Sequence, residues 1–217
     1  MENLLTMKKQ FYIQTLPQKT AELMKDFKQA KPSFLENFYL SGGTALSLQI
    51  GHRETVDLDF FSQKDFNPEL LQAKLEKFGK LNNLELDENT LNAFLKNVQI
   101  QFLGYPYSLL KPTVNWEGIR ISSVIDIACT KLQTISVRGN KKDFIDLYFI
   151  LKEYSLEKLF RNLDKKYKDS DFNKIHILKS LVYFIDANSQ PMPRMHKSIT
   201  WEEVKKSIAN KVTNLKL

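Results

Sequence analysis

A chain of 217 residues, 42% of them hydrophobic and 26% charged, has the size of one large domain or two small ones and the composition of a globular protein. Its 32 lysines and arginines outnumber its 25 aspartates and glutamates, and the net charge of +7 favours a polyanionic partner such as RNA or a nucleotide. The single cysteine, Cys129, excludes a disulfide framework, no apolar run has the length of a membrane span, and residues 1–10 lack a signal peptide, so we expect a cytoplasmic protein without a membrane partner.

The first half of the sequence mixes helical and extended patterns. Leu23, Met24 and Phe27 recur at helical spacing and predict a helix over residues 17–31. Strands are predicted at residues 38–41 and 56–61, joined by a short helix over residues 44–50. Pro68 then stands at the start of a helix over residues 68–78, and residues 84–102 alternate as two or three antiparallel strands.

From residue 122 onward the apolar residues keep a helical period. The predicted helices cover residues 122–137, 142–153, 156–164, 172–183 and 201–212. We therefore predict an α+β protein, in which a small mixed or antiparallel sheet with flanking helices (residues 1–115) precedes a helical half (residues 116–217). The aromatic residues of the last helices are expected to form core, in preference to a partner-binding module; they are Phe160, Phe172, Tyr183, Phe184 and Trp201.

Two aspartates lie on one predicted strand. Side chains alternate along a strand, so Asp57 and Asp59 point to one face while Leu58 points to the other, and Val56 and its apolar neighbours indicate burial. Two like charges in such surroundings repel each other and lose hydration unless a cation lies between them. Their oxygens suit Mg²⁺ or Mn²⁺ shared with substrate phosphates, so we predict a metal site there. The alternative is a surface ion pair of one aspartate with Arg53.

A glycine turn precedes that strand by one short helix. Gly42 and Gly43 allow the backbone to approach a phosphate closely, and the following helix directs its free N–H groups toward it. Ser41 and Thr44 fit either as helix caps or as hydroxyl ligands of a phosphate. A phosphate cradle beside paired carboxylates indicates metal-dependent chemistry on a nucleoside triphosphate.

Two blocks of the sequence, together spanning roughly residues 37–151, resemble a known family. One is the Gly-Gly-Thr turn with the Asp-Leu-Asp strand, and the other is an Asp-x4-Lys pattern (Asp126 and Lys131) followed by Lys-Asp-x2-Asp (Lys142, Asp143 and Asp146). Both are similar to motifs of the AbiEii-type nucleotidyltransferases, toxin-like members of the DNA polymerase beta superfamily.

The resemblance implies a nucleotidyltransferase-like fold that moves a nucleoside monophosphate from a nucleoside triphosphate to an acceptor hydroxyl. It implies a toxin with a cognate antitoxin, and tRNA is the acceptor suggested by related toxins. Catalysis is assigned to Asp57, Asp59, Lys131 and Asp143, with the metal held by Asp57 and Asp59. Binding of the nucleotide or its phosphates is assigned to Gly42, Gly43, Thr44, Arg53, Asp126, Lys142 and Asp146.

Several of these residues also have structural explanations. Asp126 has the spacing of a capping box with Ser123, although aspartate is short for that role. Lys142 can pair with Asp146 along one helix. His52 follows the short helix after the glycine turn, and interaction with the helix dipole is the preferred explanation for it.

One carboxylate that the superfamily uses is absent from its expected place. A third acidic residue on a later strand would activate the acceptor hydroxyl, but residues 96–102 carry Gln99 and Gln101 instead. Glu85 and Asp87 share one face of the preceding strand and are the alternative carboxylates. The sequence then supports either one metal with Asp143 or the acceptor supplying the base, or a nucleotide- or RNA-binding protein without catalysis.

Overall fold

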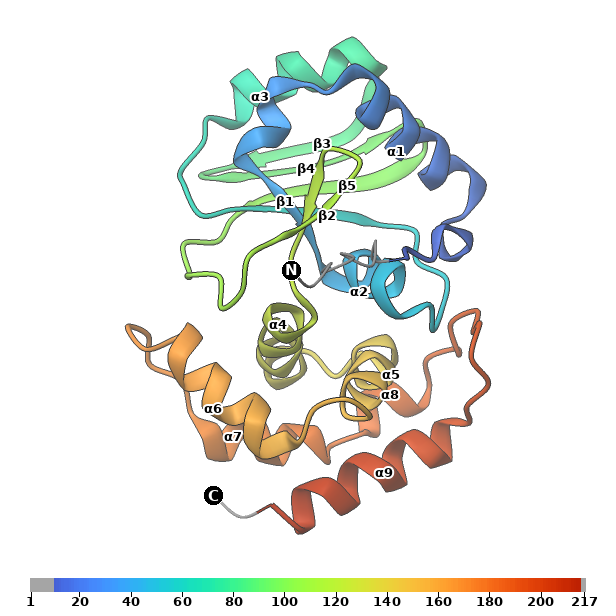
Figure 1. Ribbon diagram of the computed structural model, residues 1–217, viewed down its shortest axis with the longest axis vertical. Helices are drawn as coiled ribbons and strands as arrows, with labels where there is room; N and C mark the ends of the chain where they lie inside the picture. Colours follow the sequence, from blue (N-terminus) through green and yellow to red (C-terminus); the bar gives the residue numbers. More distant parts are fainter. Residues whose placement is uncertain (1–9, 216–217) are drawn as a thin grey trace, which may run out of the picture.

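The computed structural model describes residues 10–215 as a sheet with helices on both faces and a further helical layer beyond one of them (Figure 1). The strands are β1 (Tyr39–Ser41), β2 (Leu58–Ser62), β3 (Leu81–Asp87), β4 (Thr90–Leu95), β5 (Val98–Gly104), β6 (Val114–Trp116) and β7 (Ile119–Ile121). The helices are α1 (Gln18–Ala30), α2 (Gly42–Ile50), α3 (Pro68–Leu75), α4 (Val124–Val137), α5 (Lys141–Ile150), α6 (Leu156–Lys166), α7 (Lys174–Leu181), α8 (Ile185–Asn188) and α9 (Trp201–Thr213). Short 3₁₀ segments lie at Ile13–Thr15, Ser33–Asn37 and Glu76–Phe78.

The sheet is mixed, with the strand order β3-β4-β5-β2-β1-β7-β6. Strand β2 is antiparallel to β1 and parallel to β5, and β1 is parallel to β7. One row across the sheet positions the site: Ser41 of β1 pairs with Asp59 of β2, and Asp59 pairs with Gln101 of β5. Because α2 begins directly after Ser41, the helix start lies on one side of Asp59 and Gln101 lies on the other.

Alternation along the central strands separates the core from the site. Leu58 and Phe60 of β2 and Ile100 and Phe102 of β5 are fully buried, and the Phe60 and Phe102 rings stack with centroids 4.9 Å apart. Phe27 of α1 packs edge-on against Phe60, so this face of the sheet belongs to the layer of α1 and α3. The intervening positions, which include Asp59 and Gln101, face the opposite side, toward α4.

Helix α4 is the centre of the helical half and contacts α2, α5, α6 and α7. In Figure 1, α4 and α5 lie nearest the sheet, and α6, α7 and α9 form the outer layer. Polar caps fix where these helices begin: Ser123, Ser155 and Thr200 accept hydrogen bonds from backbone N–H groups three residues on, at α4, α6 and α9. Within residues 10–215, no helix combines the length and apolarity that crossing a membrane requires.

The α+β class and the order of sheet before helices are confirmed. Each predicted helix is present with ends shifted by a few residues, and residues 81–104 form three antiparallel strands. The hairpin of β6 and β7 was not predicted, because each strand has only three residues. It extends the sheet through Ile121, so the predicted boundary at 115/116 falls inside β6, and helical structure begins at Val124. The division into two domains stays a prediction.

The prediction of a buried strand from residue 56 is wrong at its first two positions. Strand β2 begins at Leu58, Val56 is 52% exposed, and the Asp57 side chain is 34% exposed. The segment before β2 is held by other contacts: the Thr20 hydroxyl donates to the Val56 carbonyl, and the Thr44 hydroxyl donates to the Asp57 carbonyl. Asp57 therefore stands at the entrance of the strand, and Asp59 lies within it.

The aromatic residues of the helical half are mainly core, as expected. Phe160 is buried, and the rings of Phe184 and Trp201 pack against each other and against the fully buried Phe144. Tyr183 is the exception, because half of its surface stays exposed.

Candidate functional site

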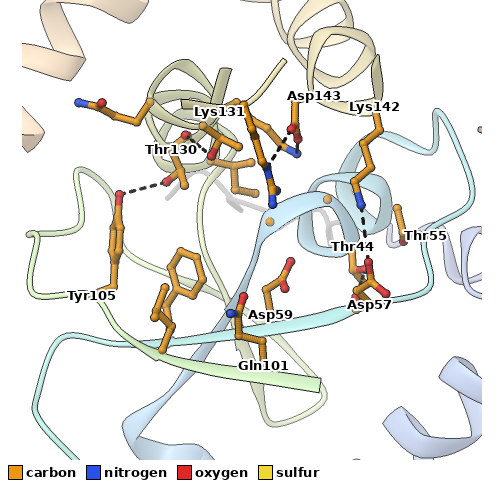
Figure 2. Close-up of a pocket in the computed structure, with 18 of the residues that line it drawn as sticks. Thr44, Thr55, Asp57, Asp59, Gln101, Tyr105, Thr130, Lys131, Lys142 and Asp143 are labelled. Carbon is orange, nitrogen blue, oxygen red and sulfur yellow. Dashed lines mark hydrogen bonds and ion pairs between the residues drawn. The ribbon is translucent and has the colours of Figure 1, made fainter. Parts of the chain in front are cut away.

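A cavity of about 780 Å³ lies between the sheet and helices α4 and α5 (Figure 2). It brings together nine of the predicted site residues: Gly42, Gly43, Thr44, Arg53, Asp57, Asp59, Lys131, Lys142 and Asp143. Asp126 and Asp146 do not line it. Asp59 points into the cavity from the sheet, and Lys131 and Asp143 face it from the helices.

The two glycines at the start of α2 allow two charged side chains to approach the helix backbone closely. Gly42 has φ +65°, and a Cβ atom there would lie 2.2 Å from Oδ2 of Asp59. A Cβ atom on Gly43 would lie 2.6 Å from Nη2 of Arg53. Both distances are shorter than the non-bonded contacts that real Cβ atoms make. The two glycines therefore leave room for a carboxylate and a guanidinium beside the first turn of the helix.

The hydroxyls of Ser41 and Thr44, beside the glycine turn, form hydrogen bonds with other residues of the protein. Ser41 is the N-cap residue of α2 by position, but its side chain makes no capping bond and accepts a hydrogen bond from the Ser122 hydroxyl at 3.0 Å. The Thr44 hydroxyl donates to the Asp57 carbonyl. The N–H groups at the start of α2 are therefore the part of this turn suited to a phosphate.

Asp59 is a partly buried carboxylate in an unfavourable electrostatic position. Burial, together with the charge of Asp57, raises the pKa of the Asp59 carboxyl, and more distant cations only partly oppose this. The alternative pairing of an aspartate with Arg53 is wrong, because the guanidinium of Arg53 binds Asp146 instead. A carboxylate with a raised pKa and no ion pair to any residue that the structure describes indicates a function that needs the charge.

A divalent cation fits these two carboxylates only if the substrate completes its coordination. No group of three or more metal-binding side chains occurs among the residues that the structure describes. Mg²⁺ characteristically takes one or two carboxylates together with water and substrate phosphates, so an aspartate pair beside a phosphate cradle matches its chemistry. Mn²⁺ prefers the same oxygen ligands.

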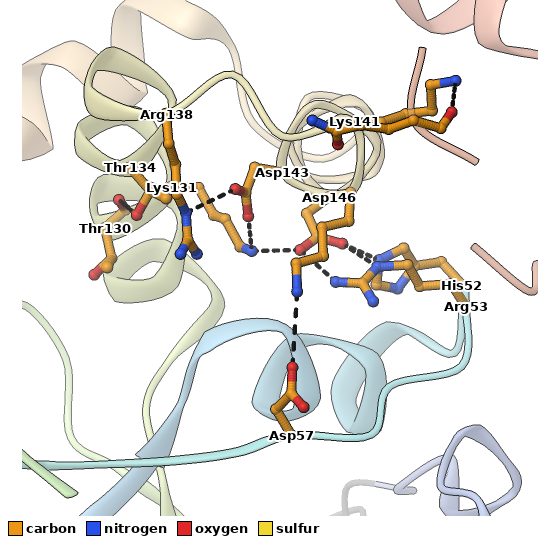
Figure 3. A network of polar contacts seen from close by, with 12 residues as sticks. His52, Arg53, Asp57, Thr130, Lys131, Thr134, Arg138, Lys141, Asp143 and Asp146 are labelled. Carbon is orange, nitrogen blue, oxygen red and sulfur yellow. Dashed lines mark hydrogen bonds and ion pairs between the residues drawn. The ribbon is translucent and has the colours of Figure 1, made fainter. Parts of the chain in front are cut away.

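Behind the cavity wall lies a buried network of charges (Figure 3). Nζ of Lys131 is 2.6 Å from Oδ1 of Asp143 and 2.6 Å from Oδ2 of Asp146. Arg53 binds both oxygens of Asp146, at 2.7 and 2.9 Å, and the His52 ring lies 2.8 Å from the same carboxylate. Lys131 thus joins α4 to α5, and Arg53 joins the segment before β2 to α5.

The network fixes the ionisation states of its members. Burial opposes charge on Asp146, but the charges of Arg53 and Lys131 and hydrogen bonds from His52 and Arg53 hold its pKa well below the usual range. Burial lowers the pKa of His52, with Asp146 only partly opposing it, so the neutral ring is favoured. The helix-dipole explanation of His52 is therefore wrong: α2 ends at Ile50, and His52 binds across the fold to α5.

Two partly exposed cationic side chains, Lys142 and Arg138, also line the cavity. Lys142, 46% exposed, has its Nζ 3.7 Å from Oδ2 of Asp57, so the proposed pair along α5 with Asp146 is wrong. Arg138, 59% exposed, has its Nε 3.6 Å from Oδ2 of Asp143. That carboxylate oxygen is buried and accepts no hydrogen bond from any described residue.

Asp126 is structural in its placement. Its carboxylate accepts hydrogen bonds from the Leu110 and Lys111 backbone and from the Ser123 hydroxyl, and it pairs with buried Lys166 at 2.9 Å. The backbone of Asp126 also donates to the Ser123 hydroxyl, so the capping explanation holds. The assignment of Asp126 to nucleotide binding is not supported by this position.

Gln101 occupies the place next to Asp59 where the third carboxylate of the superfamily was expected. Glu85 and Asp87 do not replace it, because β3 is the edge strand, two strands beyond β5, and neither residue lines the cavity. The sequence interpretation also missed the tyrosines that line the cavity beyond Gln101: Tyr105, Tyr107 and Tyr167. The signal that could have found them is the Tyr105-Pro106-Tyr107 segment, because two tyrosines at the end of a strand are typical of a binding surface.

The mixed sheet, with α2 leaving β1 beside the aspartates of β2, is a nucleotidyltransferase-like fold. The family described as nucleotidyl transferase AbiEii toxin, Type IV TA system, matches residues 26–115, a stretch that includes the glycine turn and both aspartates. The Aquifex aeolicus protein aq_aa25 is 38% identical over 182 residues, which cover 81% of this chain and 86% of that protein. The chain belongs to the AbiEii nucleotidyltransferase toxin family.

Solved structures support the fold. JHP933 from Helicobacter pylori is 20% identical, with 89% of each chain covered and a TM-score of 0.55. MenT4, a nucleotidyltransferase toxin from Mycobacterium tuberculosis, is 15% identical, with 94% of this chain and 88% of that chain covered and a TM-score of 0.53. At these identities the likeness concerns the fold alone.

Proposed function

We propose that this protein is a metal-dependent nucleotidyltransferase that moves a nucleoside monophosphate from a nucleoside triphosphate to an acceptor hydroxyl. The observation that carries the proposal is the close approach of the partly buried Asp59 carboxylate to the first turn of α2 at Gly42. Backbone N–H groups that attract phosphate and a carboxylate that attracts a cation face the same small volume. A metal–triphosphate complex satisfies both.

The triphosphate would lie along the first turn of α2, over Gly42, Gly43 and Thr44. Lys142 and Arg138 reach into the cavity from the helical side with exposed side chains, and both are suited to contact phosphate oxygens. Arg53 lies next to Gly43 with its guanidinium bound to Asp146, so it links the turn to α5 and its Nη2 remains close to the proposed phosphate position.

A divalent cation held by Asp57 and Asp59 would neutralise charge on the phosphates during transfer. The side chains around the proposed cation position would hold the reacting groups in place. Lys131 holds Asp143 and Asp146 in place, and its charge is compensated by these two carboxylates at the cavity wall. Since phosphoryl transfer depends mainly on positioning and electrostatics, such a rigid charged wall is a catalytic feature.

In the transfer step, the acceptor oxygen bonds to the α-phosphorus as the bond to the pyrophosphate oxygen breaks. The proton of the acceptor hydroxyl needs a base. Asp143 is the carboxylate assigned to this role, because it lines the cavity from α5 and its Oδ2 accepts no hydrogen bond from the described residues. Pyrophosphate, which contains the two outer phosphates of the nucleotide, then leaves.

RNA is the proposed acceptor, with the end of a tRNA as the specific candidate, because the chain is basic and a polyanion suits its charge. The family name describes a toxin of a toxin–antitoxin system. We infer that a cognate antitoxin restrains this protein in its host.

A second candidate function is nucleotide or RNA binding without turnover. Gln101 favours it, because an amide beside Asp59 neither accepts a proton as a base nor binds Mg²⁺ strongly. This candidate predicts that nucleotide binds while no pyrophosphate is released.

A transfer assay separates the two functions. The protein is incubated with Mg²⁺ or Mn²⁺, total RNA and each NTP labelled at the α-phosphate. We expect label in RNA from at least one NTP, and loss of labelling when EDTA removes the metal. Nucleotide binding by calorimetry, without label in RNA or protein under either metal, would contradict the enzyme and favour the binding protein.

Gly42→Ala is expected to lower both stability and transfer. The positive φ is unfavourable for alanine by about 1–2 kcal/mol, and the added methyl group would collide with the Asp59 carboxylate. Displacing this carboxylate from the helix start is expected to reduce the transfer rate on the order of 100-fold, measured in the same assay beside a thermal unfolding curve.

Gly118→Ala is the matched control. Gly118 also has a positive φ, of +94°, but a Cβ atom there would meet nothing within 4 Å. This variant carries backbone strain without a collision, so a lower melting temperature with unchanged transfer is expected. Normal transfer by Gly42→Ala would show that the close approach of Asp59 to α2 is not needed.

A further inference from the structure

Beyond Asp59, the cavity ends in an arm lined by tyrosines. We call Tyr105, Tyr107 and Tyr167 the tyrosine arm; all three line the cavity. The Tyr107 ring packs edge-on against the other two, with centroid distances of 4.8 Å to Tyr105 and 4.6 Å to Tyr167. The Tyr105 hydroxyl is in contact with those of Tyr167 and Thr130. The arm therefore offers ring surface and hydroxyls together.

The position of the arm relative to the phosphate cradle follows from the sheet. The row Ser41–Asp59–Gln101 puts the start of α2 on one side of Asp59 and Gln101 on the other. Tyr105 follows Gln101 along the same segment, just after β5 ends at Gly104. Figure 2 shows Asp59 between Tyr105 on one side and Thr44 and Asp57 on the other.

The direction of phosphoryl transfer indicates which of the two substrates, the nucleotide donor or the acceptor, binds in the tyrosine arm. In phosphoryl transfer the attacking and leaving oxygens are roughly in line. If pyrophosphate leaves toward the first turn of α2 from an α-phosphate bound at Asp59, the acceptor must approach that phosphorus from the side opposite to α2. The opposite side is Gln101 and the tyrosine arm.

The charge of the chain indicates what kind of acceptor approaches. Residues 122–217 contain 18 lysines and arginines against 11 aspartates and glutamates, whereas residues 1–121 contain 14 of each. The entire net charge of +7 therefore belongs to the helical half. Tyr167 directly follows α6, whose last turn carries the exposed Lys165; Lys166 beside it is buried in its pair with Asp126. A polyanion entering the arm would pass over the basic half of the molecule.

We propose that the tyrosine arm binds the terminal base of a single-stranded RNA acceptor, by stacking on Tyr107, and presents its terminal ribose hydroxyl beside Gln101. Unpaired bases are typically held by stacking on aromatic rings, and stacking tolerates any base. The Gln101 amide is then a hydrogen-bond partner for the base edge or the ribose, while the Tyr105 hydroxyl keeps its contacts with Tyr167 and Thr130. This inference rests on the proposed function and assigns the acceptor side of the same cavity.

The test compares Tyr107→Ala with wild type for two ligands. A fluorescein-labelled single-stranded oligoribonucleotide with a free 3′ hydroxyl reports acceptor binding by anisotropy, and calorimetry with Mg²⁺ and each NTP reports donor binding. We expect Tyr107→Ala to raise the Kd for the oligoribonucleotide about tenfold, as loss of one stacked base predicts, while the Kd for NTP changes less than about twofold. Tyr107→Phe keeps the ring and is expected to restore most of the RNA affinity.

Tyr183→Ala is the matched control, because Tyr183 is a half-exposed tyrosine that does not line this cavity. It is expected to leave both Kd values close to those of wild type, and thermal unfolding verifies that each variant is folded. Weaker NTP binding by Tyr107→Ala with unchanged RNA binding would overturn the inference by assigning the arm to the donor base. No change for either ligand would also overturn it.

The transfer assay distinguishes failure of this inference from failure of the proposed function. If wild type labels RNA and Tyr107→Ala does so with an unchanged KM for RNA, the acceptor assignment is wrong and the nucleotidyltransferase remains. If wild type labels protein in place of RNA, the inference is overturned while transfer stands. If wild type labels no acceptor, both are wrong.

Discussion

Asp59→Asn is expected to reduce nucleotide transfer on the order of 10³-fold or more while leaving the fold as stable as before or more stable. The amide has nearly the shape of the carboxylate but binds a divalent cation poorly, so charge stabilisation during transfer is lost. Burial and the neighbouring charge of Asp57 raise the pKa of Asp59, which means that its negative charge is unfavourable in the folded protein. Removing that charge relieves a cost of folding. Transfer rates and urea unfolding of the purified variant measure the two effects.

Glu85→Gln serves as its control. Glu85 lies on the edge strand β3, is exposed and does not line the cavity, so the same chemical change is expected to alter neither transfer nor stability. A variant Asp59→Asn that is inactive because it unfolds would contradict the electrostatic argument. A variant that keeps transfer close to the wild-type rate would remove Asp59 from the metal site.

The local sequence pattern is sufficient to predict the residues of the site that lie on the sheet and at the start of α2. Gly42 and Gly43 alone fit a tight strand-to-helix connection equally well, and the paired Asp57 and Asp59 nearby in the sequence favour phosphate binding, because charges are rare within an apolar run. All four line the cavity. Their roles depend on neighbours close in the chain, which is why spacing alone indicates them.

The helical half of the site is harder to interpret because its contacts are distant in sequence. Asp146 and Asp126 have the same residue type and both lie on helices, yet Asp146 joins the network behind the cavity and Asp126 anchors residues 110–111. The sequence assigns His52 to its own helix, although its partner lies 94 positions away. Nothing in the periodicity of a helix names a partner on another element, so these roles require the fold.

Tyr167 illustrates the same limit for the acceptor side. It lies 62 positions from Tyr105, and only the packing of α6 against the segment after β5 brings the two rings to one arm. The short hairpin β6–β7 escapes prediction for a related reason: three-residue strands carry too little alternation to be recognised.

Lys131→Met is expected to destabilise the protein by about 3–5 kcal/mol, the usual cost of removing one partner from a buried ion pair. Methionine fills a similar volume, so the loss is electrostatic rather than one of packing. Asp146 keeps Arg53 and His52, but Asp143 loses its hydrogen bond and retains only Arg138, 3.6 Å away. For a chain of this size the melting temperature should fall by roughly 6–20 °C, and transfer should be lost with the positioning of Asp143.

The exposed Lys174–Asp164 ion pair is the control that separates the effect of burial on stability from the effect of the ion pair itself. Nζ of Lys174 lies 2.6 Å from Oδ1 of Asp164, the same distance as in the Lys131–Asp143 pair, but both side chains are more than 40% exposed. Lys174→Met is therefore expected to cost less than about 1 kcal/mol in urea unfolding.

The double variant Lys131→Met/Asp143→Asn tests which carboxylate is responsible. If the cost of Lys131→Met comes from the orphaned charge of Asp143, neutralising that charge should recover at least about 2 kcal/mol of unfolding free energy, a non-additivity that a double-mutant cycle measures directly. Transfer should not recover, because the amide that replaces Asp143 lacks the carboxylate proposed to take the acceptor proton. A double variant no more stable than Lys131→Met would mean that Asp146, rather than Asp143, depends on the lysine, and that Arg53 and His52 do not suffice to hold it.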